Sequence, residues 1–261
     1  MGSVLRWCVE VTAAVVLVTM GAVRADAQSR PKVAAASSLG PALTELAARF
    51  QKDSGAGVDL VFGASGALAR QIQEGAPFEL FLAADEDFPN RLTKAGLTRD
   101  GGVVYAGGRL ALFAPTGSPL SVDPQLAGLA ALLKAGKVTR FAIANPAVAP
   151  YGAAAEAVLA RRGLLAPMRP RLVMGDTVAQ AAQFASTGNA VGGLIAASLA
   201  LNPDFAARGR VALIDASEHP PLRHRMVLTR KAGAVAQRFY QFMQTPAAQA
   251  TLGRYGFGTA E

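Results

Sequence analysis

Four short loops carry the residue types best suited to holding a small anion. Each runs from the end of an apolar, strand-like segment into the start of a helical pattern, at residues 34–40, 63–66, 145–152 and 175–178. The first backbone N–H groups of a helix have no partner inside the helix, and the helix dipole places partial positive charge there. A helix start is therefore a ready anion site. Side-chain hydroxyls add further donors from Ser37, Ser38, Ser65 and Tyr151.

The serines also have a simpler interpretation. Ser at a helix start is most often an N-cap that accepts a hydrogen bond from the backbone of its own helix. For any one loop alone, capping is the better interpretation. The hypothesis of an anion site depends on the number of loops, two in each half of the α/β pattern. Small neighbours such as Gly63, Ala64 and Gly66 would let the backbone approach a ligand closely.

Residues for catalysis are few. His219 and His224 are the only histidines, and we interpret them as surface or strand-edge residues. There is no G-x-S-x-G, H-E-x-x-H or P-loop motif, and the only cysteine, Cys8, lies near the N-terminus. We therefore expect a protein that is not an enzyme, with no catalytic residue, no cofactor and no directly bound metal ion. An anion-handling enzyme and a ligand-sensing regulator domain are the alternatives.

The first 27 residues have the pattern of an export signal. Arg6 precedes an apolar run over residues 11–23, and Ala25–Ala27 forms an A-x-A cleavage site. We expect cleavage after Ala27 and a periplasmic location, which disfavours the regulator. The net charge of +8 is spread along the chain rather than clustered. The sequence therefore predicts no nucleic-acid partner.

Strand-like and helical segments alternate from residue 31 onward. Leu39, Leu43, Leu46 and Phe50 share one face of a predicted helix over residues 41–50. Asp85 is expected to cap another helix. The alternation predicts parallel sheets with helices on their faces, arranged in two successive α/β units. Ligands of such sheets bind beyond the carboxyl ends of the strands, so we expect the site in a cleft between two lobes. Expected strands are 32–36, 57–62, 80–83, 110–114, 141–144, 171–174, 191–195, 211–214 and 223–229, and expected helices include 68–74, 126–133, 151–161, 178–185 and one that ends at Met243.

Four segments, three of which contain one of these loops, form a recognisable set of motifs. They are VAAASSLGPALTELAARF, FGASGALARQIQEGAPFELFLAADEDFPNRL, AIANPAVAPYGAAAEAVL and the terminal RYGF. Over about residues 31–258 the chain resembles the molybdate-binding proteins of ABC transporters. The resemblance implies a type II periplasmic-binding-protein fold, with two α/β lobes joined by a two-crossing hinge. Lobe 1 would then comprise residues 28–108 and 219–261, and lobe 2 residues 109–218.

The resemblance also implies a set of ligand contacts. The oxyanion-binding residues would be Ser37, Ser38, Ser65, Tyr151 and Val178, the last through its N–H. Some family members take the tyrosine from the position of Ala196 instead, whereas this chain has its tyrosine in the APYG loop. Asp176 is expected to point away from the anion into capping bonds.

The implied ligand is molybdate or tungstate, with the metal bound only as the oxyanion. The implied partner is an inner-membrane ABC permease, and the protein is expected to be a monomer. Sulfate or phosphate is the alternative ligand, because both are tetrahedral oxyanions.

Overall fold

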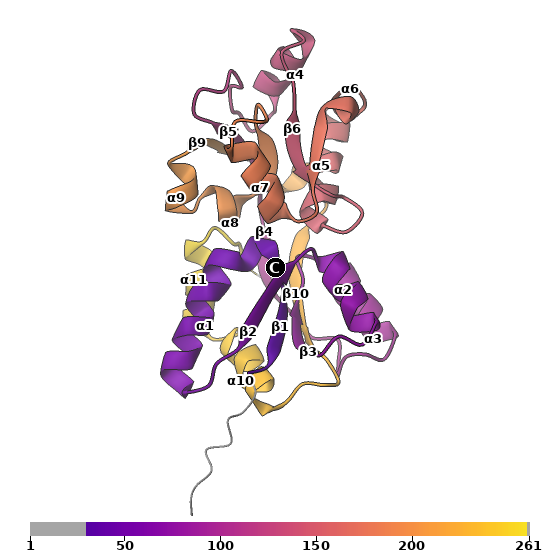
Figure 1. The fold of residues 1–261 in the computed structure, drawn as a ribbon, viewed down its shortest axis with the longest axis vertical. Helices are drawn as coiled ribbons and strands as arrows, with labels where there is room; N and C mark the ends of the chain where they lie inside the picture. The colour runs from indigo at the N-terminus through magenta and orange to yellow at the C-terminus, as the bar shows by residue number, and fades with distance from the viewer. Residues whose placement is uncertain (1–29, 260–261) are drawn as a thin grey trace, which may run out of the picture.

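Short apolar strands form the centre of each half of the molecule in the computed structural model, which describes residues 30–259. Two five-stranded sheets stand one above the other, each covered by helices (Figure 1). The predicted export signal and its cleavage site lie outside the described residues. We call the lower half in Figure 1 lobe 1 and the upper half lobe 2, each defined by its sheet.

The sheet of lobe 1 has the strand order β2-β1-β3-β10-β4. Strands β1, β2 and β3 are parallel, whereas β10 runs antiparallel to both β3 and β4. The strands are β1 (Lys32–Ala36), β2 (Asp59–Gly63), β3 (Phe78–Leu82), β4 (Val103–Gly108) and β10 (Leu222–Leu228). The helices are the 3₁₀ turn η1 (Ser37–Leu39), α1 (Gly40–Ser54), α2 (Ser65–Gln73), α3 (Asp87–Lys94), α10 (Ala234–Phe242) and α11 (Pro246–Arg254).

The sheet of lobe 2 has the order β7-β6-β8-β5-β9, with β6 parallel to β7 and β8, and β5 antiparallel to β8 and β9. Its strands are β5 (Leu110–Pro115), β6 (Phe141–Ala144), β7 (Leu172–Gly175), β8 (Gly193–Ala196) and β9 (Gly209–Leu213). Its helices are α4 (Ala127–Lys134), α5 (Pro150–Arg161), α6 (Leu165–Met168), α7 (Val178–Ser186), α8 (Ala197–Ala200) and α9 (Pro203–Ala206), with 3₁₀ turns η2 (Arg169–Arg171) and η3 (Ala216–Glu218).

Alternation along β1 places helices on both faces of the first sheet. Val33 and Ala35 pack into the core that includes α1, and Ala34 packs into the core formed with α2 and α3. The predicted apolar face is buried, with Leu39 in η1 and Leu43, Leu46 and Phe50 in α1. The Phe50 ring also packs against α10, 5.0 Å from the Phe239 centroid. These contacts fix α1, and with it the turn η1 that faces lobe 2.

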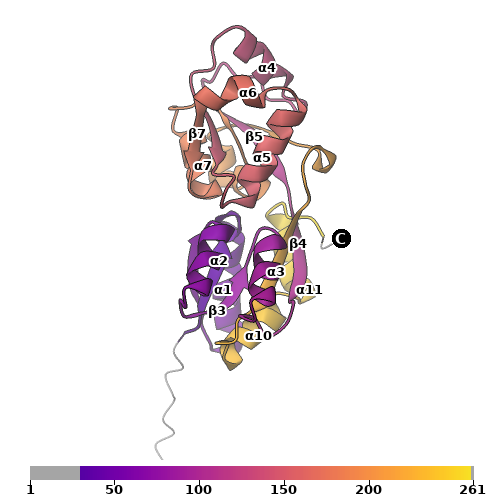
Figure 2. The same ribbon diagram turned by 90° about the vertical axis from the view of Figure 1, so that its right-hand side faces the viewer.

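The chain crosses between the lobes twice, on one side of the molecule (Figure 2). The first crossing joins β4 to β5 at Gly108 and Arg109, and the second joins β9 to β10 through η3. A Cβ atom at Gly108 would stand 2.6 Å from the Tyr151 hydroxyl and 2.7 Å from the His224 ring. Glycine is therefore required where this crossing passes the centre of the molecule.

The structure corrects the expectation of parallel sheets. Each sheet is mixed, because β10 and β5 are antiparallel strands next to the crossings. A chain that returns from one lobe to the other enters the sheet from the opposite end, and the βα alternation carries no signal for that. Strand β4 was not predicted because glycine pairs flank its short apolar stretch. Helix α11 was not predicted because its alanines favour a helix but do not distinguish an apolar face from a polar face.

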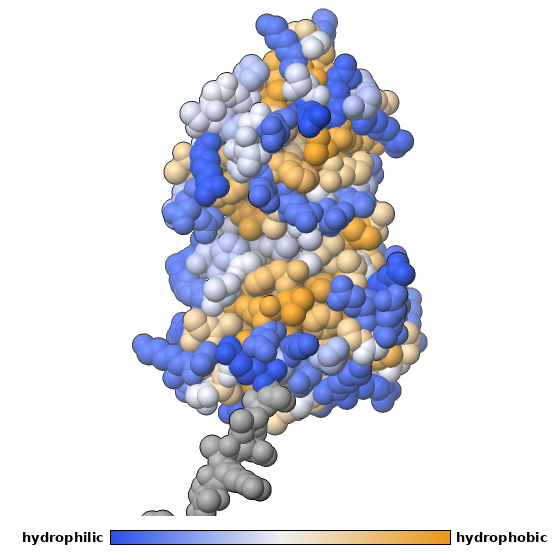
Figure 3. All heavy atoms as spheres, in the orientation of Figure 1, coloured by the Kyte–Doolittle hydropathy of each residue, from blue (hydrophilic) through white to orange (hydrophobic). Residues whose placement is uncertain are grey.

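Figure 3 shows an apolar area on the face of lobe 1 where Figure 1 draws the edge strand β2. Val61 and Phe62 of β2 are 37% and 40% exposed. This edge lies on an outer face of lobe 1.

Candidate functional site

All five residues predicted to contact an anion line one cavity between the lobes. Ser37, Ser38 and Ser65 come from lobe 1, and Tyr151 and Val178 come from lobe 2. The cavity has a volume of about 10 Å³ available to the centre of a water molecule, far below the roughly 300–1,000 Å³ of ordinary small-molecule sites. Only a ligand of a few heavy atoms would fit. The other lining residues are Ala36, Gly63, Ala64, Ala84, Ala149 and Pro150, so no charged side chain lines the cavity within the described part of the chain.

Four helical segments begin at this cavity. Turn η1 starts with Ser37, α2 with Ser65 and α7 with Val178, while α5 starts one residue before Tyr151. The first amides of each helix have no acceptor within their own helix. The cavity therefore receives the positive ends of several helix dipoles.

The serines do not cap these helices. The N-cap positions of η1, α2 and α5 are Ala36, Ala64 and Ala149, none with a side-chain cap hydrogen bond. The hydroxyls lie one or two residues farther on, at the cavity. In α7 the cap is Thr177, whose hydroxyl accepts from the Gln180 amide. The capping interpretation of Ser37, Ser38 and Ser65 is therefore wrong.

Two serine hydroxyls accept hydrogen bonds from backbone amides. Ser65 Oγ accepts from Ala84 N at 3.0 Å, and Ser37 Oγ accepts from Ala179 N at 3.3 Å. An oxygen that accepts from a fixed N–H keeps its own proton for another acceptor. Both hydroxyls are therefore available as donors to an anion.

Tyr151 places a phenol in the same interior. The side chain is 1% exposed, and its hydroxyl makes no well-formed hydrogen bond to any described residue. Burial raises the pKa of Tyr151, although the nearby Ser38 hydroxyl and the Arg109 backbone partly oppose this. The phenol is therefore neutral at physiological pH and carries a proton that it can donate.

The lobes are closed on each other around the cavity. Gly66 N donates to Val148 O at 2.8 Å, and Ser198 Oγ donates to Ser38 O at 2.8 Å. A Cβ atom at Gly66 would stand 3.0 Å from Val148 O, so a residue without a side chain is needed where the lobes meet here. Ser198 was not predicted, because its partner is 160 residues away and the sequence gives no local sign of the contact.

Ala196 and Asp176 lie outside the lining of the cavity. Ala196 and Ala197 are fully buried at the junction of β8 and α8. Asp176 is exposed, its N–H donates to Gln180 Oε1 at 2.7 Å, and the cap of α7 is its neighbour Thr177. The expectation that Asp176 points away is consistent with this placement, but its capping role belongs to Thr177. The N-cap of α3 is Glu86, so the prediction that Asp85 occupies the N-cap position is wrong by one residue.

The interpretation of the histidines as surface or strand-edge residues is wrong. His219 is 7% exposed and His224 is fully buried. His224 lies on β10, between β3 and β4, and its Nε2 is 3.4 Å from Ser38 Oγ. A signal for its burial was present, since Leu222, His224 and Met226 alternate with Arg223 and Arg225 along the strand.

Comparisons with known proteins bear on this arrangement. Residues 31–258 match the family model described as bacterial extracellular solute-binding protein. The chain belongs to this family of solute-binding proteins. It is 37% identical to the molybdate-binding protein ModA of Azotobacter vinelandii over 87% of this chain and 89% of that protein. It is 34% identical to ModA of Rhodobacter capsulatus, over 82% of both chains.

A solved structure, the periplasmic molybdate-binding protein of Azotobacter vinelandii, superposes with a TM-score of 0.81 at 30% identity. The match covers 89% of this chain and all of the other. The type II periplasmic-binding-protein fold expected from the resemblance is thereby confirmed. The family is one of solute-binding transport proteins rather than of enzymes.

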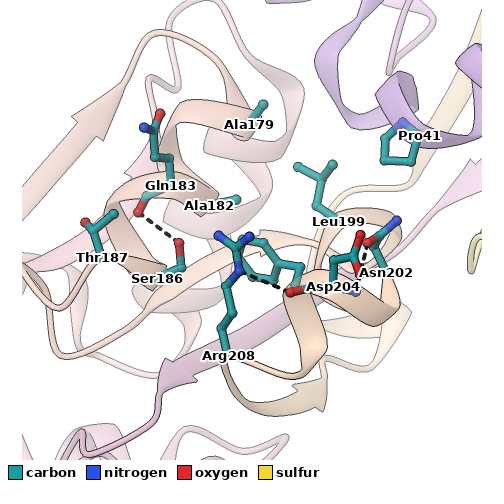
Figure 4. Close-up of a pocket in the computed structure, with 11 residues that line it drawn as sticks. Pro41, Ala179, Ala182, Gln183, Ser186, Thr187, Leu199, Asn202, Asp204 and Arg208 are labelled. Atoms are coloured by element: carbon teal, nitrogen blue, oxygen red, sulfur yellow. Dashed lines mark hydrogen bonds between the residues drawn. The ribbon is translucent and has the colours of Figure 1, made fainter.

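This solute-binding protein has a larger, more open hollow at the rim of the lobes (Figure 4). Pro41 of α1 faces residues of α7 and of the α8–α9 region across it. Two of its polar side chains bond within their own segment, since Arg208 Nε donates to Asp204 O and Ser186 Oγ donates to Gln183 O. They do not converge on a common point, so we place the candidate site in the smaller cavity.

Two features are absent from residues 30–259 of this solute-binding protein. No helix in that range is both long and apolar enough to span a membrane. The same range holds no group of three or more His, Cys, Asp or Glu side chains placed to bind a metal ion.

Proposed function

We propose that this protein captures molybdate, or the near-isosteric tungstate, in the cavity between its lobes and delivers it to the permease of an ABC importer. Ser37, Ser38, Ser65 and Tyr151 would donate through hydroxyls, and Val178 through its N–H. The observation that carries the proposal is the convergence of these neutral donors on one small, uncharged cavity. The identity of 37% to a molybdate-binding protein over most of both chains supports the choice of ligand.

Neutral donors are suited to recognising an anion by size. A hydrogen bond to a charged group contributes about 1.5–3 kcal/mol, so five contribute roughly 8–15 kcal/mol before the costs of association. Those costs begin at about 4 kcal/mol. A net of about −8 kcal/mol corresponds to a Kd of about 1 μM. Because closure of the lobes fixes the donors, an anion of the wrong radius forms fewer of these bonds.

Sulfate is the second candidate, since a shell of neutral donors suits any fully deprotonated tetrahedral dianion. Phosphate fits less well. At neutral pH it retains a proton that must be donated, and none of the carboxylates that the structure describes lines the cavity to accept it. The choice between molybdate and sulfate rests on the size of the closed cavity.

Isothermal titration of the exported, untagged protein with molybdate, tungstate, sulfate and phosphate tests the proposal. We expect one-to-one binding of molybdate and tungstate, with a Kd of about 1 μM or tighter. Sulfate and phosphate should give no heat of binding at the same concentrations. Selective binding of sulfate would replace the ligand, and silence with all four anions would refute oxyanion capture.

We also propose the division of the chain and its location. Lobe 1 would comprise residues 28–108 and 219–261, and lobe 2 residues 109–218; the positions of β4, β5 and β10 in their sheets support this. The protein would act in the periplasm as a monomer, after cleavage behind Ala27. Intact mass of the exported protein tests the cleavage, and a mass that includes residues 1–27 would refute it.

A further inference from the structure

His224 is a buried titratable group directly behind the candidate site. Its Nε2 lies 3.4 Å from Ser38 Oγ, and its Nδ1 lies 3.0 Å from Leu222 O. A carbonyl oxygen only accepts, so Nδ1 carries a proton. In the neutral ring Nε2 is then an acceptor, and its neighbour Ser38 must be the donor of that pair.

The groups that surround His224 are uncharged. Tyr105 of β4, Tyr151 of α5 and Phe257 near the C-terminus present their rings at 6.2, 6.0 and 5.3 Å between centroids. Burial raises the pKa of both tyrosines, so they stay neutral. Ser38 of η1 completes the set.

The charged side chains nearest in sequence lie on the other face of β10. Arg223 and Arg225 alternate with His224 along the strand, and both pair with Glu86. The pKa of His224 is lowered to about 4 by burial, opposed only by the hydrogen bond to Leu222, and no carboxylate contributes. The ring is therefore neutral at physiological pH in this structure.

A neutral His224 ring disfavours the binding of an anion in the cavity. When the Ser38 hydroxyl donates its proton to His224 Nε2, its oxygen turns lone pairs toward the oxyanion. If the hydroxyl turned to donate to the anion, Nε2 would be left buried without a donor, which is unfavourable. A protonated ring removes the conflict: Nε2–H donates to Ser38 Oγ, and Ser38 O–H donates to the anion.

We propose that His224 is a positioning residue of the oxyanion site and that anion capture is coupled to uptake of one proton at its Nε2. The proton comes from the buffer acid, whose bond to hydrogen breaks as an N–H bond forms on the ring, and no covalent bond of the oxyanion or of Ser38 changes. The inference depends on the proposed function, because the coupled ligand is the oxyanion. By linkage, the anion raises the pKa of the ring by as much as the protonated ring tightens anion binding. A rise from about 4 to 7 corresponds to roughly a thousandfold preference of the anion for the protonated form.

Proton uptake is measured by titrating molybdate into untagged protein at about pH 7 in several buffers of different ionisation enthalpy. The slope of the observed enthalpy against that ionisation enthalpy is the number of protons taken up. We expect between about one half and one proton per anion, and a Kd that rises up to about tenfold per pH unit from pH 6 to 8. His224→Gln should bind more weakly with a slope near zero. His219→Gln is the matched control, since His219 bonds to Pro220 O rather than to a cavity residue, and it should keep the slope.

A second measurement needs no variant. The protein has two histidines, so the ¹⁵N ring signals of the wild-type chain can be assigned with the His219→Gln spectrum. We expect His224 to be the neutral Nδ1–H tautomer without ligand and doubly protonated with saturating molybdate. A neutral ring in the complex, or proton uptake that persists in His224→Gln, would overturn the proposal. Molybdate binding with a zero slope would overturn it while the proposed function stands, and absence of any oxyanion binding would overturn both.

Discussion

Ser65→Ala separates the two things that one hydroxyl does. Ser65 is fully buried, its Oγ accepts from Ala84 N at 3.0 Å, and its O–H is free to donate into the cavity. The substitution removes one donor to the anion and one acceptor for a buried amide. The first loss weakens binding, and the second weakens folding.

Both magnitudes follow from hydrogen-bond energies. A bond to a charged acceptor contributes about 1.5–3 kcal/mol, and about 1.4 kcal/mol is a factor of ten. The Kd for molybdate should therefore rise by roughly 10- to 150-fold. Leaving the Ala84 amide unpaired costs about 1–3 kcal/mol of the free energy of unfolding. Alanine itself fits, because it removes only the oxygen atom.

Calorimetric titration gives the first quantity and urea denaturation without ligand gives the second. Ser186→Ala is the matched control, since Ser186 is also a helical serine but bonds to Gln183 O away from the cavity. It should change neither quantity by more than about 0.5 kcal/mol. An unchanged molybdate Kd in folded Ser65→Ala would show that this hydroxyl is not a ligand and would refute the assignment.

Three further changes probe other parts of the structure. Tyr151→Phe should raise the molybdate Kd, measured by titration, about tenfold or more. It should not lower the free energy of unfolding, since the buried hydroxyl lacks a well-formed partner among the described residues. Lower stability with unchanged affinity would contradict this expectation. Gly66→Val should hinder closure of the lobes, because a Cβ atom at this position would stand 2.6 Å from Phe88 and 3.0 Å from Val148 O. Small-angle scattering should detect a more open molecule, and titration should detect weaker binding of molybdate. Unaltered scattering and affinity would count against this expectation. Burial raises the pKa of Asp85 to about 7, so the folded state holds a proton that the unfolded state releases near pH 4, and stability falls as pH rises between these values. In urea denaturation Asp85→Asn should lessen the decline from pH 5 to 8 by at most roughly 3 kcal/mol, and parallel curves for variant and wild type would exclude the shift.

The spacing of apolar residues and the loops between strands and helices predicted the elements that depend on neighbouring residues alone. The spacing of Leu39, Leu43, Leu46 and Phe50 predicted α1 because a helix buries one face. The loops at the ends of β1, β2, β6 and β7 predicted where hydroxyls and helix starts meet. These signals lie within ten or twenty residues of the feature that they describe.

Contacts between distant segments escaped prediction. The order of β10 between β3 and β4 depends on a chain that leaves lobe 1 and returns more than 100 residues later. The bond from Ser198 to Ser38 O depends on closure of the lobes. His224 is intermediate between these cases, since alternation along its strand marks a buried position but does not reveal that Ser38 lies opposite.

The charge balance of the cavity connects the donors to the histidine. The α-helices α2, α5 and α7 begin at the cavity, each contributing roughly half a positive charge at its start. Their sum of about 1.5 charges falls short of a dianion, and no cationic side chain among the lining residues supplies the difference. A proton on His224 would supply it from behind Ser38, without a permanent cation that would attract anions of any size. The neutral donors would thus select the anion by its geometry, whereas His224 would take up its proton only once a dianion has entered the cavity.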